Sequence, residues 1–399
     1  MKYQSEIEFV IKMTKYAIAE VDVSTDAIAL FKEYKDVNWN IVKRLTTLNK
    51  IDGLIFNYIK LLPNDLAKNI PYYDYYKIVY KKAVLDNINR MEFLDKLRVE
   101  AHDSPINYCL LKGSVSRHFY PDPTMRHMGD TDILYRNIPD NEAVILFNKL
   151  DYEIVENKPK EFIFKSKNLG LIVELQSSLV DSGYRLWYKY LSTIWSRLIK
   201  VGQSGEYKMR DEDFFIYHII HMAKHFINGG IGLRHIVDTY VIYKHFSKNS
   251  DFDFSYVHST LKELHIEKFY LRIMGLIDYW YENDIKKIDN ATLNLTRFII
   301  TTGAFGNKKQ RYANHMFLKK QNILKRVFPG ATTMGNYYGI DFEKEKLKLI
   351  PYWIKLNMAR AKKGKKNIED IKDSLNISNE KIAYTKKIFT YCGLDDSLL

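Results

Sequence analysis

The 399-residue sequence predicts an α+β protein in which a small mixed sheet lies between two helical regions. Before residue 106 and after residue 211, apolar residues recur every three or four positions, as on one face of a helix. Between these regions the apolar residues form short runs bounded by turn residues, as in strands. We therefore expect a helical region over 1–105, a sheet-containing core over 106–205, and a helical domain over 206–399.

The N-terminal region is expected to consist of helices near Glu6–Glu20, Thr25–Tyr34, Asn38–Lys60 and Tyr73–His102. Their apolar residues follow the helical period and show few strand-like alternations. The sequence Asp103-Ser104-Pro105 then ends the last long helix, because proline disfavours helical backbone in the residue before it.

The middle section is expected to contain four strands and two helices. Gly and Ser at 113–114 and the polar stretch 166–170 supply turns between apolar runs. The predicted strands are Ile106–Leu111, Thr131–Tyr135, Phe162–Lys165 and Leu171–Leu175, and the predicted helices are Ser114–Tyr120 and Asn141–Leu150. Helical spacing returns at Asp211, with breaks at Gly229-Gly230 and Phe328-Pro329-Gly330.

The net charge of +13 belongs almost entirely to the last quarter of the chain. Residues 301–399 contain 20 Lys and Arg against 9 Asp and Glu, whereas residues 1–300 contain 41 against 39. This basic quarter is either a solvated face or a surface for an anionic acceptor, such as a nucleic-acid end, an acidic glycan or a phospholipid surface. Its basic residues include Lys308, Lys309, Arg311, Lys319, Lys320, Lys325, Arg326 and the cluster Arg360–Lys366.

The two cysteines, Cys109 and Cys392, cannot form a disulfide framework and fit a reducing compartment. The N-terminus lacks the uninterrupted apolar region of a signal peptide. No segment has the ~18 uncharged apolar residues of a membrane span. We expect a cytoplasmic protein without a membrane span.

Three features of the middle section carry candidate chemistry. Leu111-Lys112-Gly113-Ser114 ends a predicted strand with a glycine that allows close approach of the backbone to a bound group, and Ser114 would begin a helix with free N–H donors for an anion. Asp130 and Asp132 lie two residues apart, so in a strand they point to the same face. Glu174 lies within an apolar run, where a buried carboxylate needs a partner.

Each feature also has a structural interpretation. Gly-Ser after a strand is often only a turn, and Ser114 can act as a cap. Asp130 and Asp132 can be solvated acids of a surface strand, and Glu174 can face water. Two adjacent carboxylates repel each other unless a divalent cation lies between them, and the three features together are more informative than each one alone.

The combination resembles a bacterial nucleotidyltransferase-like family of the polymerase-beta-type superfamily. The resemblance rests on Leu110–Ser114, Tyr120–Pro123 with Arg126, and Gly129-Asp130-Thr131-Asp132, with Glu174 as the third carboxylate. The segments Asp211–Phe226, Gly230–Asp238 and Phe328–Gly330 also look like this family.

This resemblance implies a mixed sheet flanked by helices, with Asp130, Asp132 and Glu174 as catalytic residues and ligands of Mg²⁺ or Mn²⁺. It implies attack of an acceptor hydroxyl on the α-phosphate of a nucleoside triphosphate such as ATP, with release of pyrophosphate. Glu174 or Asp132 would accept the proton, and the turn at Gly113 and Ser114 would hold the β- and γ-phosphates.

Six further residues, all cations or histidines, are candidate nucleotide-binding residues. His218, His221 and His225 share one helix face, and His221, Lys224 and His225 either point into the nucleotide cleft or pair with acids such as Asp238. Zinc binding is a less favoured interpretation, because no third-ligand motif accompanies the histidines.

Arg234 can reach a triphosphate or form a salt bridge to Asp238. Lys112 and Arg126 flank the predicted cleft; either can bind phosphate, and Arg126 can instead form a structural ion pair.

The sequence thus predicts a metal-dependent nucleotidyltransferase whose acceptor is a small molecule, a glycan, a protein or a tRNA. Two alternatives remain: a catalytically silent nucleotide-binding or scaffolding protein, and a toxin-like enzyme that modifies tRNA or protein.

Overall fold

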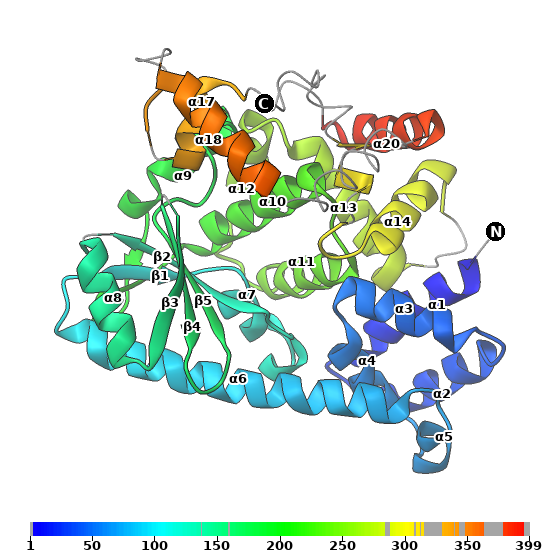
Figure 1. Cartoon of the computed structure of the whole chain (residues 1–399). Helices are drawn as coiled ribbons and strands as arrows, with labels where there is room; N and C mark the ends of the chain where they lie inside the picture. Colours follow the sequence, from blue (N-terminus) through cyan, green and yellow to red (C-terminus); the bar gives the residue numbers. More distant parts are fainter. Residues whose placement is uncertain are drawn as a thin grey trace.

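The computed structural model describes residues 3–136, 138–158, 160–283, 288–306, 309–311, 313–314, 329–338, 340–342, 348–362 and 378–394. Within these residues it confirms the α+β class, with one seven-stranded mixed sheet between helical N- and C-terminal regions (Figure 1). The strands are β1 (Asn107–Leu110), β2 (Asp130–Arg136), β3 (Tyr152–Lys158), β4 (Glu161–Ser166), β5 (Ile172–Gln176), β6 (Ile199–Lys200) and β7 (Glu206–Lys208).

The strand order is β3-β4-β5-β2-β1-β7-β6. The pairs β2–β5 and β1–β7 are parallel, and the other neighbours are antiparallel. The register of the central parallel pair sets Asp130 opposite Ile172 and Asp132 opposite Glu174. All four predicted strands are present.

Three strands, β3, β6 and β7, were not predicted. All residues of β3 after Tyr152 are exposed, so this edge strand lacks the alternation of a half-buried strand. The strands β6 and β7 have only two and three residues, too few for a periodic pattern.

One face of the sheet is covered by the long helix α6 (Tyr73–His102) and by α8 (Asp140–Lys149). Apolar side chains of β2, β4 and β5 point to this side, and the rings of Phe147 and Phe164 stack with centroids 4.1 Å apart. Figure 1 shows α6 running from the N-terminal helices to the sheet. Because side chains alternate along a strand, the intervening residues of β2 and β5 project from the opposite face.

That opposite face meets α7 (Gly113–Ser116), α9 (Arg185–Ser192), α10 (Asp211–Asn228) and α11 (Leu233–Phe246). A second apolar core joins these helices to the N-terminal and C-terminal helices. The remaining helices are α1 (Gln4–Ala17), α2 (Ser24–Glu33), α3 (Trp39–Asn49), α4 (Asp52–Ile59), α5 (Asn64–Lys68), α12 (Phe254–Glu263), α13 (Glu267–Ile277), α14 (Asn290–Thr302), α17 (Ala331–Tyr338), α18 (Leu349–Lys362) and α20 (Asn379–Cys392).

The prediction of a single helix over Asn38–Lys60 is wrong, because the chain turns between α3 and α4. Lys50 adopts left-handed backbone with φ 57°. The hydroxyls of Thr46 and Thr47 donate to Asp52 Oδ1 at 2.8 and 2.9 Å and fix the start of α4. Nothing in the periodicity of the apolar residues marks this turn.

Several predicted features of the basic quarter lie outside the described residues: Lys308, Lys319, Lys320, Lys325, Arg326, Phe328 and positions 363–366. The cysteines Cys109 and Cys392 are both buried and unpaired. Among the described residues, no helix has the length and apolar character that crossing a membrane requires.

Candidate functional site

Three carboxylates from two adjacent strands face one cavity. Asp130 and Asp132 project from the same face of β2, and Glu174 lies beside Asp132 on β5. All three line a cavity of about 300 Å³ between the sheet and the helices α10 and α11. The sequence-predicted triad is therefore brought together on one side of the sheet.

The carboxylates influence one another strongly. Burial, and then the charges of Asp132 and Asp130, raise the pKa of Glu174 to about 7. Burial and the charge of Asp132 likewise raise the pKa of Asp130. Placing like charges this close in a poorly solvated site costs free energy unless a cation balances them.

One such cation is the ammonium of Lys112, whose Nζ lies 2.5 Å from Asp132 Oδ1. Burial disfavours the charged ammonium, but Asp132, Tyr217 and Glu174 together outweigh this effect, so the pKa of Lys112 lies above its ordinary value. Lys112 adopts a φ of 46° between β1 and α7, a conformation that costs a non-glycine residue about 1–3 kcal/mol. Its carbonyl accepts hydrogen bonds from the backbone N–H and the hydroxyl of Ser116, which hold this turn.

The donor set suits a hard divalent cation, since it consists of carboxylate oxygens. As the described side chains stand, no three His, Cys, Asp or Glu residues form a ready metal centre. The Lys112 ammonium instead supplies positive charge beside Asp132. A divalent ion would have to share Asp132 with this lysine or displace it.

The turn at Gly113 and Ser114 contributes differently from the expectation. Gly113 lines the cavity, and a Cβ at this position would collide with the Arg126 guanidinium and lie 3.0 Å from Met128 Sδ. The N–H groups of Ser114 and Val115 already donate to the carbonyls of Leu111 and Lys112. The N–H groups of Ser114 and Val115 are therefore not the free donors that were expected at the start of this helix. The hydroxyl of Ser114 is buried without a hydrogen-bond partner among the described residues.

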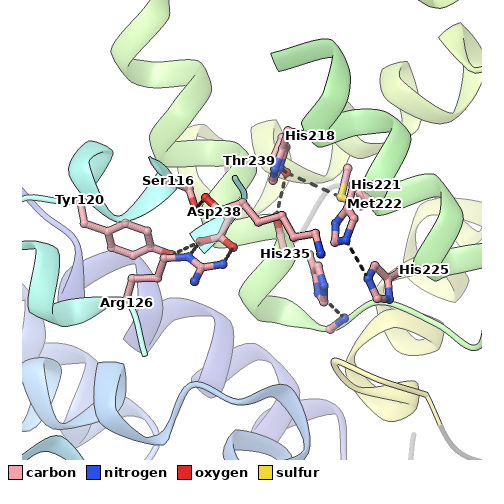
Figure 2. Close-up of polar contacts among 12 residues, drawn as sticks. Ser116, Tyr120, Arg126, His218, His221, Met222, His225, His235, Asp238 and Thr239 are labelled. Atoms are coloured by element: carbon pink, nitrogen blue, oxygen red, sulfur yellow. Dashed lines mark hydrogen bonds and ion pairs between the residues drawn. The ribbon is translucent and has the colours of Figure 1, made fainter. Parts of the chain in front are cut away.

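Arg126 forms a structural ion pair, which was the alternative to phosphate binding, and its partner Asp238 is distant in the sequence. Its Nε and Nη2 donate to Asp238 Oδ1 and Oδ2, both at 2.9 Å, and the Tyr120 hydroxyl donates to Asp238 Oδ1 at 2.8 Å (Figure 2). Arg126 also lines the cavity, so its guanidinium forms part of the wall while both carboxylate oxygens of Asp238 hold it.

Arg234 is a cation of the cavity lining that can bind an anionic ligand. It lines the cavity, and its predicted alternative partner Asp238 is bound by Arg126. Among the described residues Arg234 has no ion pair, and its Nε is buried without a hydrogen-bond partner. Its guanidinium lies 5.7 Å from the ring centre of Phe305. A half-buried guanidinium with no ion-pair partner among the described residues suits an anionic ligand such as phosphate.

Three histidines of α10 line the cavity, as their spacing predicts: His218, His221 and His225. His221 Nε2 lies 3.1 Å from His225 Nε2, and His218 Nε2 lies 2.9 Å from Thr239 Oγ1 (Figure 2). Burial lowers the pKa of His218 to about 4 and that of His225 to about 3. These rings are neutral at pH 7 and can donate or accept hydrogen bonds.

Lys224 does not line the same cavity as the histidines. It faces a neighbouring cavity of about 500 Å³, where its Nζ lies 4.0 Å from Asp181 Oδ2. Helix α10 thus borders two cavities.

Arg90 and Tyr217 shape the site, and the sequence analysis did not single them out. Arg90 of α6 is buried, and it donates to Thr131 Oγ1 at 2.8 Å and to the carbonyl of Gly129 at 3.0 Å. It also contacts the carbonyl of Ile172, so it ties together the starts of β2 and β5. Tyr217 lines the cavity with a buried hydroxyl that has no partner among the described residues. Arg90 could have been found from the sequence as a charged residue at a core position of α6. No sequence feature distinguished Tyr217.

The fold and the site together define a class. A glycine turn after β1, an Asp-x-Asp start to β2 and a third carboxylate on the adjacent parallel strand are the features of a nucleotidyltransferase. The chain belongs to the uncharacterised nucleotidyltransferase family, whose model matches residues 35–282. This match confirms the predicted resemblance and implies a nucleoside triphosphate as substrate. Comparisons with curated proteins and with solved structures give no match.

Proposed function

We propose that the protein is a metal-dependent nucleotidyltransferase that moves a nucleoside monophosphate from a triphosphate to a hydroxyl acceptor. The observation that carries this proposal is the in-register pair Asp132 and Glu174, which faces one cavity together with Asp130. Arg234 lines the same cavity and has no ion-pair partner in the described part of the chain. Acidic and basic groups thus line one enclosure large enough for a phosphate chain.

Asp130, Asp132 and Glu174 would hold Mg²⁺ or Mn²⁺. When bound, the metal offsets phosphate charge and lowers the pKa of the acceptor hydroxyl. Arg234 binds the phosphates, and the neutral imidazoles of His221 and His225 orient the nucleotide by hydrogen bonds.

In the reaction, the acceptor oxygen forms a bond to the α-phosphorus, and the bond from that phosphorus to the bridging oxygen of pyrophosphate breaks. The acceptor proton passes to Glu174 or to Asp132. Since Lys112 already engages Asp132, Glu174 is the better placed proton acceptor. Pyrophosphate then leaves past Arg234.

The test uses α-labelled triphosphates with Mg²⁺ or Mn²⁺, comparing wild type with the double variant Asp130→Asn/Asp132→Asn. Glu153→Gln, on the exposed edge strand β3, is the matched control. We expect metal-dependent nucleotide binding in wild type and control, with pyrophosphate release once an acceptor hydroxyl is supplied, and neither in the double variant. Binding without any transfer would favour the catalytically silent alternative, and equal turnover by the double variant would refute the metal-site assignment.

A further inference from the structure

The larger neighbouring cavity is not accounted for by nucleotide binding. It has a volume of about 500 Å³ and lies between the ends of β3, β4 and β5, the loop after β5, α10 and α17. Its lining includes Glu161, Gln176, Asp181 and Lys224.

This cavity adjoins the carboxylate site along one face of β5. Glu174 lines the first cavity and Gln176 lines the second, and residues two apart on a strand point to the same face. They are separated by two strand rises, about 6.6 Å. Helix α10 continues the connection, since His221 and His225 border the first cavity and Lys224 borders the second. A molecule in the second cavity therefore lies within reach of the proton acceptor.

The second cavity has an unsatisfied polar group. The Nε2 atom of Gln176 is buried and has no hydrogen-bond partner among the described residues. Glu161 lies directly opposite Gln176 in the β4–β5 pairing. A buried amide donor without a partner costs free energy that a ligand acceptor atom would recover.

The charges of the second cavity are balanced. Three acids and three lysines line it: Glu156, Glu161, Asp181, Lys158, Lys160 and Lys224. Lys158 already pairs with both Glu156 and Glu161 at 3.1 Å. The three carboxylates would repel a polyanion, and the three ammonium groups would repel a polycation. Hydroxyl groups, which donate and accept, match such a mixed lining.

We infer that this second cavity is the acceptor subsite, and that it takes a small, electrically neutral, hydroxyl-rich molecule of about the size of a disaccharide or a nucleoside. The inference rests on the proposed function. One hydroxyl of the acceptor is presented toward Glu174, while Gln176 and the carboxylate of Glu161 bind its other hydroxyls. The volume of about 500 Å³ matches a small molecule better than the end of a tRNA.

The test measures nucleotide transfer by the full chain to named probes: maltose and adenosine as neutral acceptors, spermine as a polycation, and an RNA oligonucleotide as a polyanion. Label transfer and pyrophosphate release are followed with Mg²⁺ and α-labelled triphosphate. We expect a neutral probe to stimulate wild type. The variant Gln176→Leu should raise the KM for that probe about tenfold, the factor that corresponds to loss of one buried hydrogen bond. Its affinity for the triphosphate should equal that of wild type.

A second pair of variants tests the location independently of acceptor identity. Both native cysteines are buried, so Ser178→Cys provides a single reactive thiol at the second cavity, and Ser259→Cys on the exposed face of α12 is the control. Maleimide labelling of the first variant should abolish transfer and spare triphosphate binding, whereas labelling of the control should change neither.

Stimulation by RNA or spermine alone, or no response to the neutral probes from a chain that binds triphosphate, would overturn the acceptor inference and leave the proposed function intact. Unimpaired transfer after labelling at residue 178 would overturn it as well. Absence of metal-dependent triphosphate binding in wild type would instead refute the proposed function.

Discussion

Asp132 of β2 and Glu174 of β5 are direct partners in a parallel strand pair, although 42 positions separate them in the sequence. Parallel pairing sets both carboxylates on one face of the sheet. Asp130, two residues before Asp132, lies on the same face. The fold thus concentrates negative charge where a nucleotidyltransferase needs it. The ammonium of Lys112 neutralises part of that negative charge.

Removal of the Lys112 charge should destabilise the protein in the absence of divalent cations. The variant Lys112→Met leaves the buried Asp132 without its counterion, and breaking a buried pair costs about 3–5 kcal/mol. We expect a lower Tm in a chelator and a larger gain of Tm on adding Mg²⁺ than in wild type. Thermal unfolding with and without Mg²⁺ measures both, with Lys189→Met on the exposed face of α9 as the control. Equal Mg²⁺ responses in the variant and in wild type would argue against a shared cation position.

Replacement of Arg234 should weaken nucleotide binding with little effect on stability. Arg234 has no ion-pair partner among the described residues, so Arg234→Gln leaves no orphaned carboxylate. Loss of a charged hydrogen bond worth about 1.5–3 kcal/mol corresponds to a Kd about 10 to 150 times higher. Calorimetric titration with a non-hydrolysable triphosphate measures this change. A Kd like that of wild type would remove Arg234 from the phosphate site.

Replacement of Arg126 should destabilise the protein, because the Asp238 carboxylate pairs with the Arg126 guanidinium. Both oxygens of the buried Asp238 carboxylate accept from Arg126, and Arg126→Gln leaves that charge uncompensated at a cost of about 3–5 kcal/mol. The double variant Arg126→Gln/Asp238→Asn should recover much of the loss, since it removes both charges. Chemical unfolding of the three proteins tests this expectation. If the double variant were as unstable as the sum of the singles, the pair would not act as a unit.

The histidine-lined cavity should make the protein less stable at mildly acidic pH. Burial lowers the pKa of His218 to about 4 and of His225 to about 3, whereas an unfolded chain has histidines near 6.5. Since the folded-state values are the lower ones, the unfolded chain takes up protons first as the pH falls below about 6.5. The free energy of unfolding should therefore be full above about pH 6.5 and fall toward about pH 4.

The charges around His225 support this direction. Beyond burial, Lys112 between β1 and α7, Lys224 of α10 and Arg234 of α11 lower its pKa, and only Asp130 of β2 opposes them among its main influences. Unfolding measured between about pH 7 and pH 5 should show a shallower decline for His225→Gln than for wild type. His265→Gln, at an exposed position, is the control. Identical slopes for all three would show that His225 does not carry the effect.

The sequence predicted those parts of the site that depend on local periodicity. Alternation along β2 gave Asp130 and Asp132 a common face, and helical spacing gave His218, His221 and His225 theirs. The partner of Arg126 is 112 positions away, and no local pattern specifies such a pairing. Lys224 belongs to the same helix as the histidines, but it faces a different cavity because α10 packs between two cavities. A single sequence does not define this packing.

The most direct test of the central claim is Mn²⁺ binding in the presence of a non-hydrolysable triphosphate, followed by the electron paramagnetic resonance signal of the free ion. The account predicts that wild type and the control Glu153→Gln bind Mn²⁺, and that Asp132→Asn and Glu174→Gln each lose at least tenfold in affinity. Wild-type affinity for Mn²⁺ in both variants would contradict a metal site on these two carboxylates.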